Sequence, residues 1–96
     1  MMIKFTLTET VQMMPLTNPW LYVDVPLNKI PTGPKRGWGS VPIIATLGQT
    51  TWRTSIFLLQ KNNYFIPLKK KVRIQEGVYC GGVVTISYRL AKGEEI

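Results

Sequence analysis

The chain has 96 residues and a formal net charge of +7, with 12 lysines and arginines against 5 acids; 45% of its residues are hydrophobic and 18% are charged. This length leaves no room for a second hydrophobic core, and the high apolar share excludes a disordered chain. The absence of histidine and the single Cys80 exclude a Cys/His zinc site, an internal disulfide and histidine-activated nucleophiles.

The first part of the chain predicts two strands separated by a loop. Residues 3–8, "IKFTLT", alternate apolar and polar side chains with the period of two of a half-buried strand. Residues 11–19 contain two prolines and an asparagine and predict a loop, and residues 20–25, "WLYVDV", predict a second strand. The three prolines and three glycines of residues 26–40 then predict a long irregular loop.

The middle of the chain predicts a tight β-hairpin. Two strands, residues 40–47 and 51–59, are separated by "GQT", and a glycine at the first central position is typical of a type II′ turn. Along the second strand, one face is expected to carry Trp52, Thr54, Ile56 and Leu58, and the other Arg53, Ser55, Phe57 and Leu59. Both faces are partly apolar, as in a closed barrel.

The stretch "IPLKKKVRIQEGVYCGG" at 66–82 predicts a strand, a short helix and a turn. Pro67 is favoured in the first turn of a helix, and Leu68 and Val72 would then share one helix face. Gly77 is expected to end the helix in the left-handed conformation, with Val78 folding back. The flanking strands are residues 64–66 and 83–90, and Cys80 is expected to be a small buried hydrophobe rather than a reactive thiol.

Five short motifs together carry a family resemblance. They are "FTL" near the start, "WLYVDVP" at 20–26, "GSVPI" at 39–43, "WRTSI" at 52–56 and "IPLKKKVR" at 66–73. In this order and spacing they resemble the small bacterial domain-of-unknown-function family nineteen-oh-five. The resemblance spans nearly the whole chain, although no single motif is specific.

The resemblance implies a small all-β fold, a double-split β-barrel of about six to seven strands with one short helix before the last strand. AbrB-type and MazE-type regulators share this broad architecture and bind DNA as dimers. Their strand-helix-turn-strand unit is similar to residues 66–84 here, with Pro67, Gly77, Val78 and Gly81 in corresponding roles. Gly82 departs from that pattern, because the relatives carry an acidic residue after the second glycine.

The distribution of charge gives a first hypothesis of function. No acid occurs between Asp24 and Glu76, and such a cationic stretch favours nucleic acid or another polyanion. Trp38, Tyr64 or Phe65 would stack on unpaired bases if the ligand were single-stranded. The residues expected to contact phosphates are Lys69, Lys70, Lys71, Arg73, Lys35, Arg36 and Arg53. The alternative is that these bases only form a solvated face that keeps a small β protein soluble.

The loop around "TGPKRGWG" gives a second hypothesis, that of a scaffold or interaction module. Trp38 would anchor a protein partner or a small ligand, with Lys35 and Arg36 beside it. The alternative is a structural role in which Trp38 folds over an open end of the barrel.

Catalysis is the weakest interpretation of this sequence. Glu9, Asp24 and Glu76 are the only carboxylates outside the extreme termini, and their spacing suggests no acid-base pair. Asp24 is instead expected to pair with an arginine such as Arg53 or Arg73. No nucleotide-binding glycine motif is present, so we expect no cofactor and no enzymatic activity.

The remaining expectations concern location and assembly. The apolar runs are far shorter than the about 18 residues that a membrane-spanning helix needs, and the start lacks a secretory apolar region, so we expect a cytoplasmic protein with no membrane contact. The whole of residues 1–96 is expected to form one domain, with 92–96 as a frayed tail. Open strand edges would allow a homodimer, and the residues leave the oligomeric state undecided.

Overall fold

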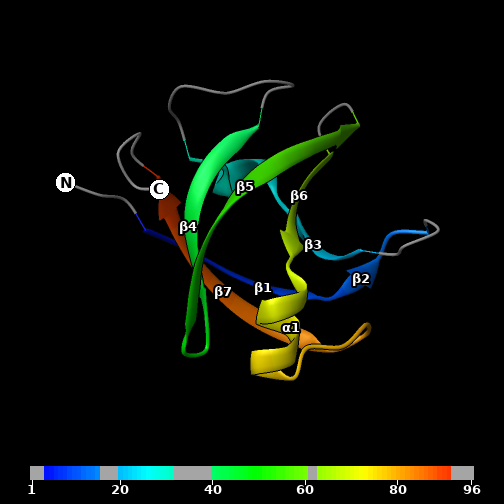
Figure 1. The fold of residues 1–96 in the computed structure, drawn as a ribbon. Coiled ribbons are helices and arrows are strands. Elements are labelled where there is room, and N and C mark those ends of the chain that lie inside the picture. The colour runs from blue at the N-terminus through cyan, green and yellow to red at the C-terminus, as the bar shows by residue number, and fades with distance from the viewer. Residues whose placement is uncertain (1–3, 16–19, 32–39, 61–62, 92–96) are drawn as a thin grey trace.

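A computed structural model describes residues 4–15, 20–31, 40–60 and 63–91, which form one curled antiparallel sheet and a short helix (Figure 1). The sheet has seven strands in the order β1-β7-β4-β5-β6-β3-β2. The all-β class, the number of strands and the single helix before the last strand are confirmed. The elements are β1 (Lys4–Thr10), β2 (Gln12–Met13), β3 (Leu21–Val25), a 3-10 turn η1 (Leu27–Lys29), β4 (Val41–Leu47), β5 (Thr50–Gln60), β6 (Asn63–Leu68), α1 (Lys70–Glu76) and β7 (Val83–Leu90).

The two edges of the sheet belong to one extended segment. β1 pairs with β7 at one edge and β2 pairs with β3 at the other, and only Val11 separates β1 from β2. Val11 is buried; its N–H donates to the Gly82 carbonyl at 2.7 Å, and its carbonyl accepts from the Gly81 N–H at 2.8 Å. The sheet therefore curls into a half-barrel, and the segment formed by β1, Val11 and β2 supplies the strand at each of its two edges (Figure 1). The two-residue strand β2 lies where the sequence predicted a loop.

The hairpin between β4 and β5 is confirmed. Leu47 pairs with Thr50, so Gly48 and Gln49 form a two-residue turn. Gly48 has φ +60, the positive value that the first position of such a turn requires. A Cβ on Gly48 would also collide with the Glu76 carboxylate, which would have to move to make room.

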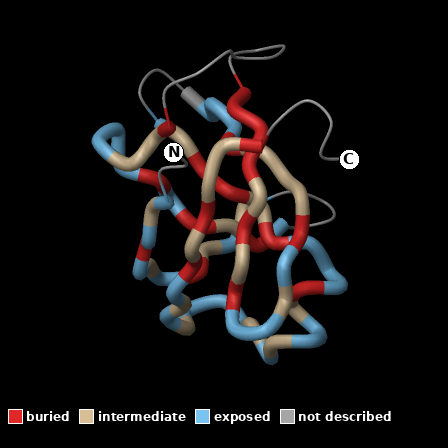
Figure 2. The backbone as a smooth tube through the Cα atoms, turned by 90° about the vertical axis from the view of Figure 1, so that its left-hand side faces the viewer, coloured by how far each residue is buried: buried red, intermediate tan, exposed pale blue. Residues whose placement is uncertain are grey.

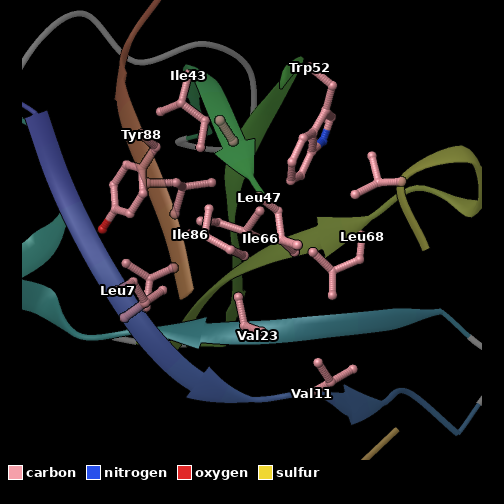
Figure 3. Packing of buried hydrophobic residues seen from close by; sticks show 14 of the residues in the cluster. Leu7, Val11, Val23, Ile43, Leu47, Trp52, Ile66, Leu68, Ile86 and Tyr88 are labelled. Atoms are coloured by element: carbon pink, nitrogen blue, oxygen red, sulfur yellow. The ribbon is translucent and has the colours of Figure 1, made fainter. Parts of the chain in front are cut away.

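The core fills the concave side of the curled sheet. Along β1, β3 and most of β7, more buried positions alternate with less buried ones, as the period of two requires (Figure 2). Side chains from β4, β5, β6 and β7 converge on those of β1 and β3 (Figure 3). The fully enclosed members include Val23, Ile43, Ile56, Ile66 and Ile86.

The helix α1 begins later than the sequence predicted. Pro67 and Leu68 belong to β6, and Lys69 is the extended N-cap residue before the helix. β6 pairs with β5 only as far as Phe65, so Pro67 lies where the strand has one neighbour and its missing N–H is tolerated. Leu68 is buried as the last core residue of this strand and not as part of a helix face.

The end of α1 is as predicted. Gly77 has φ 64 and ψ 36, the left-handed conformation. The N–H of Val78 donates to the Arg73 carbonyl at 2.9 Å, which is the long hydrogen bond of a Schellman motif. Val78 packs against the core, and Val72 is the buried residue of the helix.

Among the described residues, no helix is long and apolar enough to cross a membrane.

Candidate functional site

The outer face of β5 carries a basic and an aromatic side chain. Trp52 and Ile56 are buried, so the intervening positions of the strand turn away from the core. Arg53, Ser55 and Phe57 therefore project from the convex side of the sheet, and Phe57 is 37% exposed.

Aromatic rings continue this face across the neighbouring strands. Phe65 of β6 pairs with Phe57, and their ring centroids lie 5.8 Å apart. Tyr22 of β3 meets Phe65 edge to face at 5.6 Å. Trp20, two residues before Tyr22, continues the extended chain, since its carbonyl accepts from the Met14 N–H at 2.8 Å. Trp20 is 51% exposed, and we call Trp20, Tyr22, Phe65 and Phe57 the aromatic row.

Two residues of α1, the buried Val72 and the C-terminal Glu76, hold the helix beside the outer face of β5. Val72 is 1% exposed. The Thr50 hydroxyl donates to Oε2 of Glu76 at 2.5 Å, which joins the end of α1 to the β4–β5 hairpin. The start of α1 and Arg73 consequently lie alongside β5, where Arg53 projects.

A pocket of about 530 Å³ lies between α1, β5 and the start of β3, and we call it the basic pocket. Four of its lining residues are cationic, and none of those in the described part of the chain is acidic. The lining residues are Trp20, Leu21, Arg53, Thr54, Ser55, Phe57, Pro67, Leu68, Lys69, Lys70 and Arg73.

Both arginines of the basic pocket hold a buried donor that has no acceptor in the described part of the chain. The Nε atoms of Arg53 and Arg73 are inaccessible to solvent and have no hydrogen-bond partner among the described residues. Leaving a buried donor on a charged group unpaired costs several times more than a neutral hydrogen bond contributes. Arg53 and Arg73 line the same pocket, and a phosphate or carboxylate in it would match the planar donor geometry of their guanidinium groups.

The structure brings together part of the basic set predicted from the sequence. Arg53, Lys69, Lys70 and Arg73 line the basic pocket. Lys71 turns to a neighbouring hollow beside the β4–β5 hairpin, which Lys69 also lines. Lys35, Arg36 and Trp38 lie outside the described residues, and so does the interaction loop built on them.

Two aromatic residues of the site were missed from the sequence. Tyr64 and Phe65 were expected to stack on bases, but Phe65 is only 6% exposed and Tyr64 packs against the core. Trp20 and Phe57 hold the exposed positions instead. The signal for Phe57 was present, because strand alternation already placed it on the face of Arg53.

Two other sequence expectations are corrected. The Asp24 carboxylate accepts a hydrogen bond of 2.5 Å from Nε2 of Gln12, and it lines a hollow away from Arg53 and Arg73. The two-residue strand β2 brings Gln12 next to β3, which the predicted loop did not allow. Cys80 is exposed rather than buried, because it lies in the turn before β7.

Among the described residues, no three His, Cys, Asp or Glu side chains gather where they could hold a metal ion.

The comparison with known families agrees with the motifs in the sequence. No curated protein matches the chain. The model of the family described as a domain of unknown function, DUF1905, matches residues 7–87, a span that runs from β1 into β7 and includes α1. The chain therefore belongs to the DUF1905 family.

Proposed function

We propose that the protein is a non-catalytic module that binds single-stranded nucleic acid on the face formed by the basic pocket and the aromatic row. The observation that carries this proposal is the position of exposed Trp20 and Phe57 beside four cationic residues, with no acid among the described lining residues. Modules that bind single strands combine a cationic groove with aromatic side chains on which bases stack.

The exposed aromatic residues favour a single strand over a duplex. In a duplex the base faces are stacked inside, so Trp20 and Phe57 would find only the backbone and the base edges in the grooves, with no open base face on which to stack. In a single strand the faces are open, and each stacked base contributes about 1–3 kcal/mol. The chain's net charge of +7 adds attraction for either ligand.

The experiment is fluorescence anisotropy of labelled oligothymidylate and of a labelled duplex at several salt concentrations. We expect tighter binding of the single strand. If the four cationic residues of the basic pocket each contact a phosphate, the logarithm of the association constant should fall against the logarithm of salt with a slope of about −3. Absence of binding to either ligand at low salt would refute the proposal.

Two double variants, each of which removes two positive charges, test whether binding depends on the basic pocket or only on net charge. Changing Arg53 and Arg73 to glutamine removes two charges from the basic pocket. Changing Lys4 and Lys71 to glutamine removes two charges elsewhere, on β1 and on the part of α1 that faces the other hollow. We expect the first pair to weaken binding of the oligonucleotide much more than the second.

A second candidate function, a contact with a protein, is favoured by the exposed apolar end of β5. Phe57, Leu58 and Leu59 are 37%, 40% and 49% exposed in consecutive positions, so both faces of the strand present apolar surface. Binding through this surface would depend little on salt, which separates it from binding of a polyanion.

A further inference from the structure

We infer that the basic pocket is a subsite for one nucleotide unit, with the phosphate between the guanidinium groups of Arg53 and Arg73 and the base against Trp20. This inference rests on the proposed function and assigns a specific ligand group to each part of the face. The unit can come from a free nucleoside monophosphate or from a residue within a strand.

The phosphate position follows from the two arginines. Arg53 belongs to β5 and Arg73 to α1, and both residues line the basic pocket. Two guanidinium groups that share a pocket repel each other, and no acid among its described lining residues compensates them. One phosphate would accept from both groups; a monoester dianion would neutralise both charges, and a phosphodiester would neutralise one of them. Ser55, on the same face of β5 as Arg53, adds a neutral hydroxyl donor.

The base position follows from the opposite part of the lining. Trp20, Leu21 and Phe57 supply apolar surface, and the Trp20 ring is half exposed. A planar base resting on this indole would bury both rings from water, and the sugar would bridge to the arginines. A purely inorganic anion would leave this apolar part of the pocket unused.

The size of the basic pocket agrees with a ligand of this class. Its volume of about 530 Å³ lies within the range of about 300–1,000 Å³ that small-molecule sites occupy. Lys69 and Lys70 also line the pocket, where further phosphates of a strand would be neutralised.

The test is isothermal titration of the protein with thymidine monophosphate, thymidine, inorganic phosphate and oligothymidylate. We expect the monophosphate to bind more tightly than either thymidine or phosphate. Trp20→Ala should lower the affinity for the monophosphate by about tenfold, because the base loses its stacking partner. Trp20→Phe should restore part of this affinity. Equal affinity for phosphate and monophosphate, with no effect of Trp20→Ala, would overturn the inference.

A variant that keeps the net charge distinguishes binding at the subsite from general electrostatic attraction by the positively charged protein. In Arg53→Lys with Arg73→Lys the net charge is unchanged, but the forked donors and both Nε groups are lost. We expect this variant to lose at least about tenfold in affinity for the monophosphate, the loss of about 1.4 kcal/mol, while the salt dependence of oligothymidylate binding is kept. Circular dichroism confirms that the variant is folded.

The outcomes distinguish this inference from the proposed function. If oligothymidylate binds but the monophosphate does not, and Arg→Lys has no effect, the subsite is refuted and the proposed function stands. If the monophosphate binds and oligothymidylate does not, the subsite stands and binding of nucleic acid is refuted.

Discussion

The hydroxyl of Thr50 donates a hydrogen bond of 2.5 Å to Oε2 of Glu76, and this contact joins the β4–β5 hairpin to the last residue of α1. Glu76 is one of few carboxylates in the chain, and its oxygen is used here to position the helix. Because Arg73, Lys69 and Lys70 lie on or next to α1, the shape of the basic pocket depends on this contact.

Thr50→Val should therefore loosen α1. Removing a hydroxyl that donates to a carboxylate costs about 1–3 kcal/mol of unfolding free energy, since the acceptor is charged. Urea denaturation measures this change, and amide exchange in residues 70–76 should accelerate. Thr10→Val on β1 is the matched control, because Thr10 is exposed and its strand pairs with β7, and we expect it to change stability little. Equal effects of the two variants would contradict this role of Thr50.

Gly48→Ala should be more destabilising than Gly77→Ala. Both glycines have positive φ, and an alanine in this conformation costs about 1 kcal/mol relative to glycine. A Cβ at Gly77 meets nothing within 4 Å, whereas a Cβ at Gly48 collides with the Glu76 carboxylate and would displace it from Thr50. Urea denaturation of both variants gives the comparison. A smaller loss for Gly48→Ala would show that the hairpin does not hold Glu76 in this position.

Val72 should anchor the helix, and Ile74 should not. Val72 is 1% exposed and belongs to the core, while Ile74 on the same helix is 70% exposed. Val72→Ala removes buried methyl groups and leaves a cavity, which costs about 2 kcal/mol. Ile74→Ala should change the free energy of unfolding by less than about 0.5 kcal/mol. Thermal unfolding of the two variants checks this, and similar losses would contradict the packing of α1.

Tyr88 should make the protein sensitive to high pH. Burial raises the pKa of Tyr88 to about 12 from 10.0, and its hydroxyl donates to the Lys29 carbonyl at 2.5 Å. Between these two values the unfolded chain has released the Tyr88 proton and the folded chain retains it, so stability falls as pH rises. Tyr88→Phe should lose less stability than the native chain from pH 10 to pH 12 in urea titrations. Parallel curves for the two proteins would contradict this assignment.

Local signals in the sequence predicted most of the elements correctly. The alternation of residues 83–90 gave β7 with its observed bounds, and glycine chemistry gave the turn at Gly48 and the end of α1 at Gly77. The start of α1 was wrong because Pro67 is compatible with a helix start and with a strand that has one neighbour. Local preference did not distinguish these cases; the pairing of β6 with β3 does.

Long-range contacts explain the rest of what the sequence did not predict. Gln12–Met13 has no strand pattern of its own, and it is a strand because it lies against β3. The basic pocket needs Trp20, Arg53 and Arg73 together, and these come from the start of β3, from β5 and from α1, which the tertiary fold places around one hollow. The basic residues near the helix were identifiable from composition and Phe57 from strand alternation, but the position of Trp20 beside them was not.

The most direct test of the account is the proton-nitrogen NMR spectrum of the arginine Nε–H groups during titration with oligothymidylate. We predict saturable shifts for the Nε–H signals of Arg53 and Arg73, whose buried donors have no acceptor among the described residues, together with the indole signal of Trp20. Arg89 on β7 is the internal control and should not respond. Binding that leaves Arg53 and Arg73 unchanged while it shifts signals on β1 and β7 would contradict the basic pocket as the site.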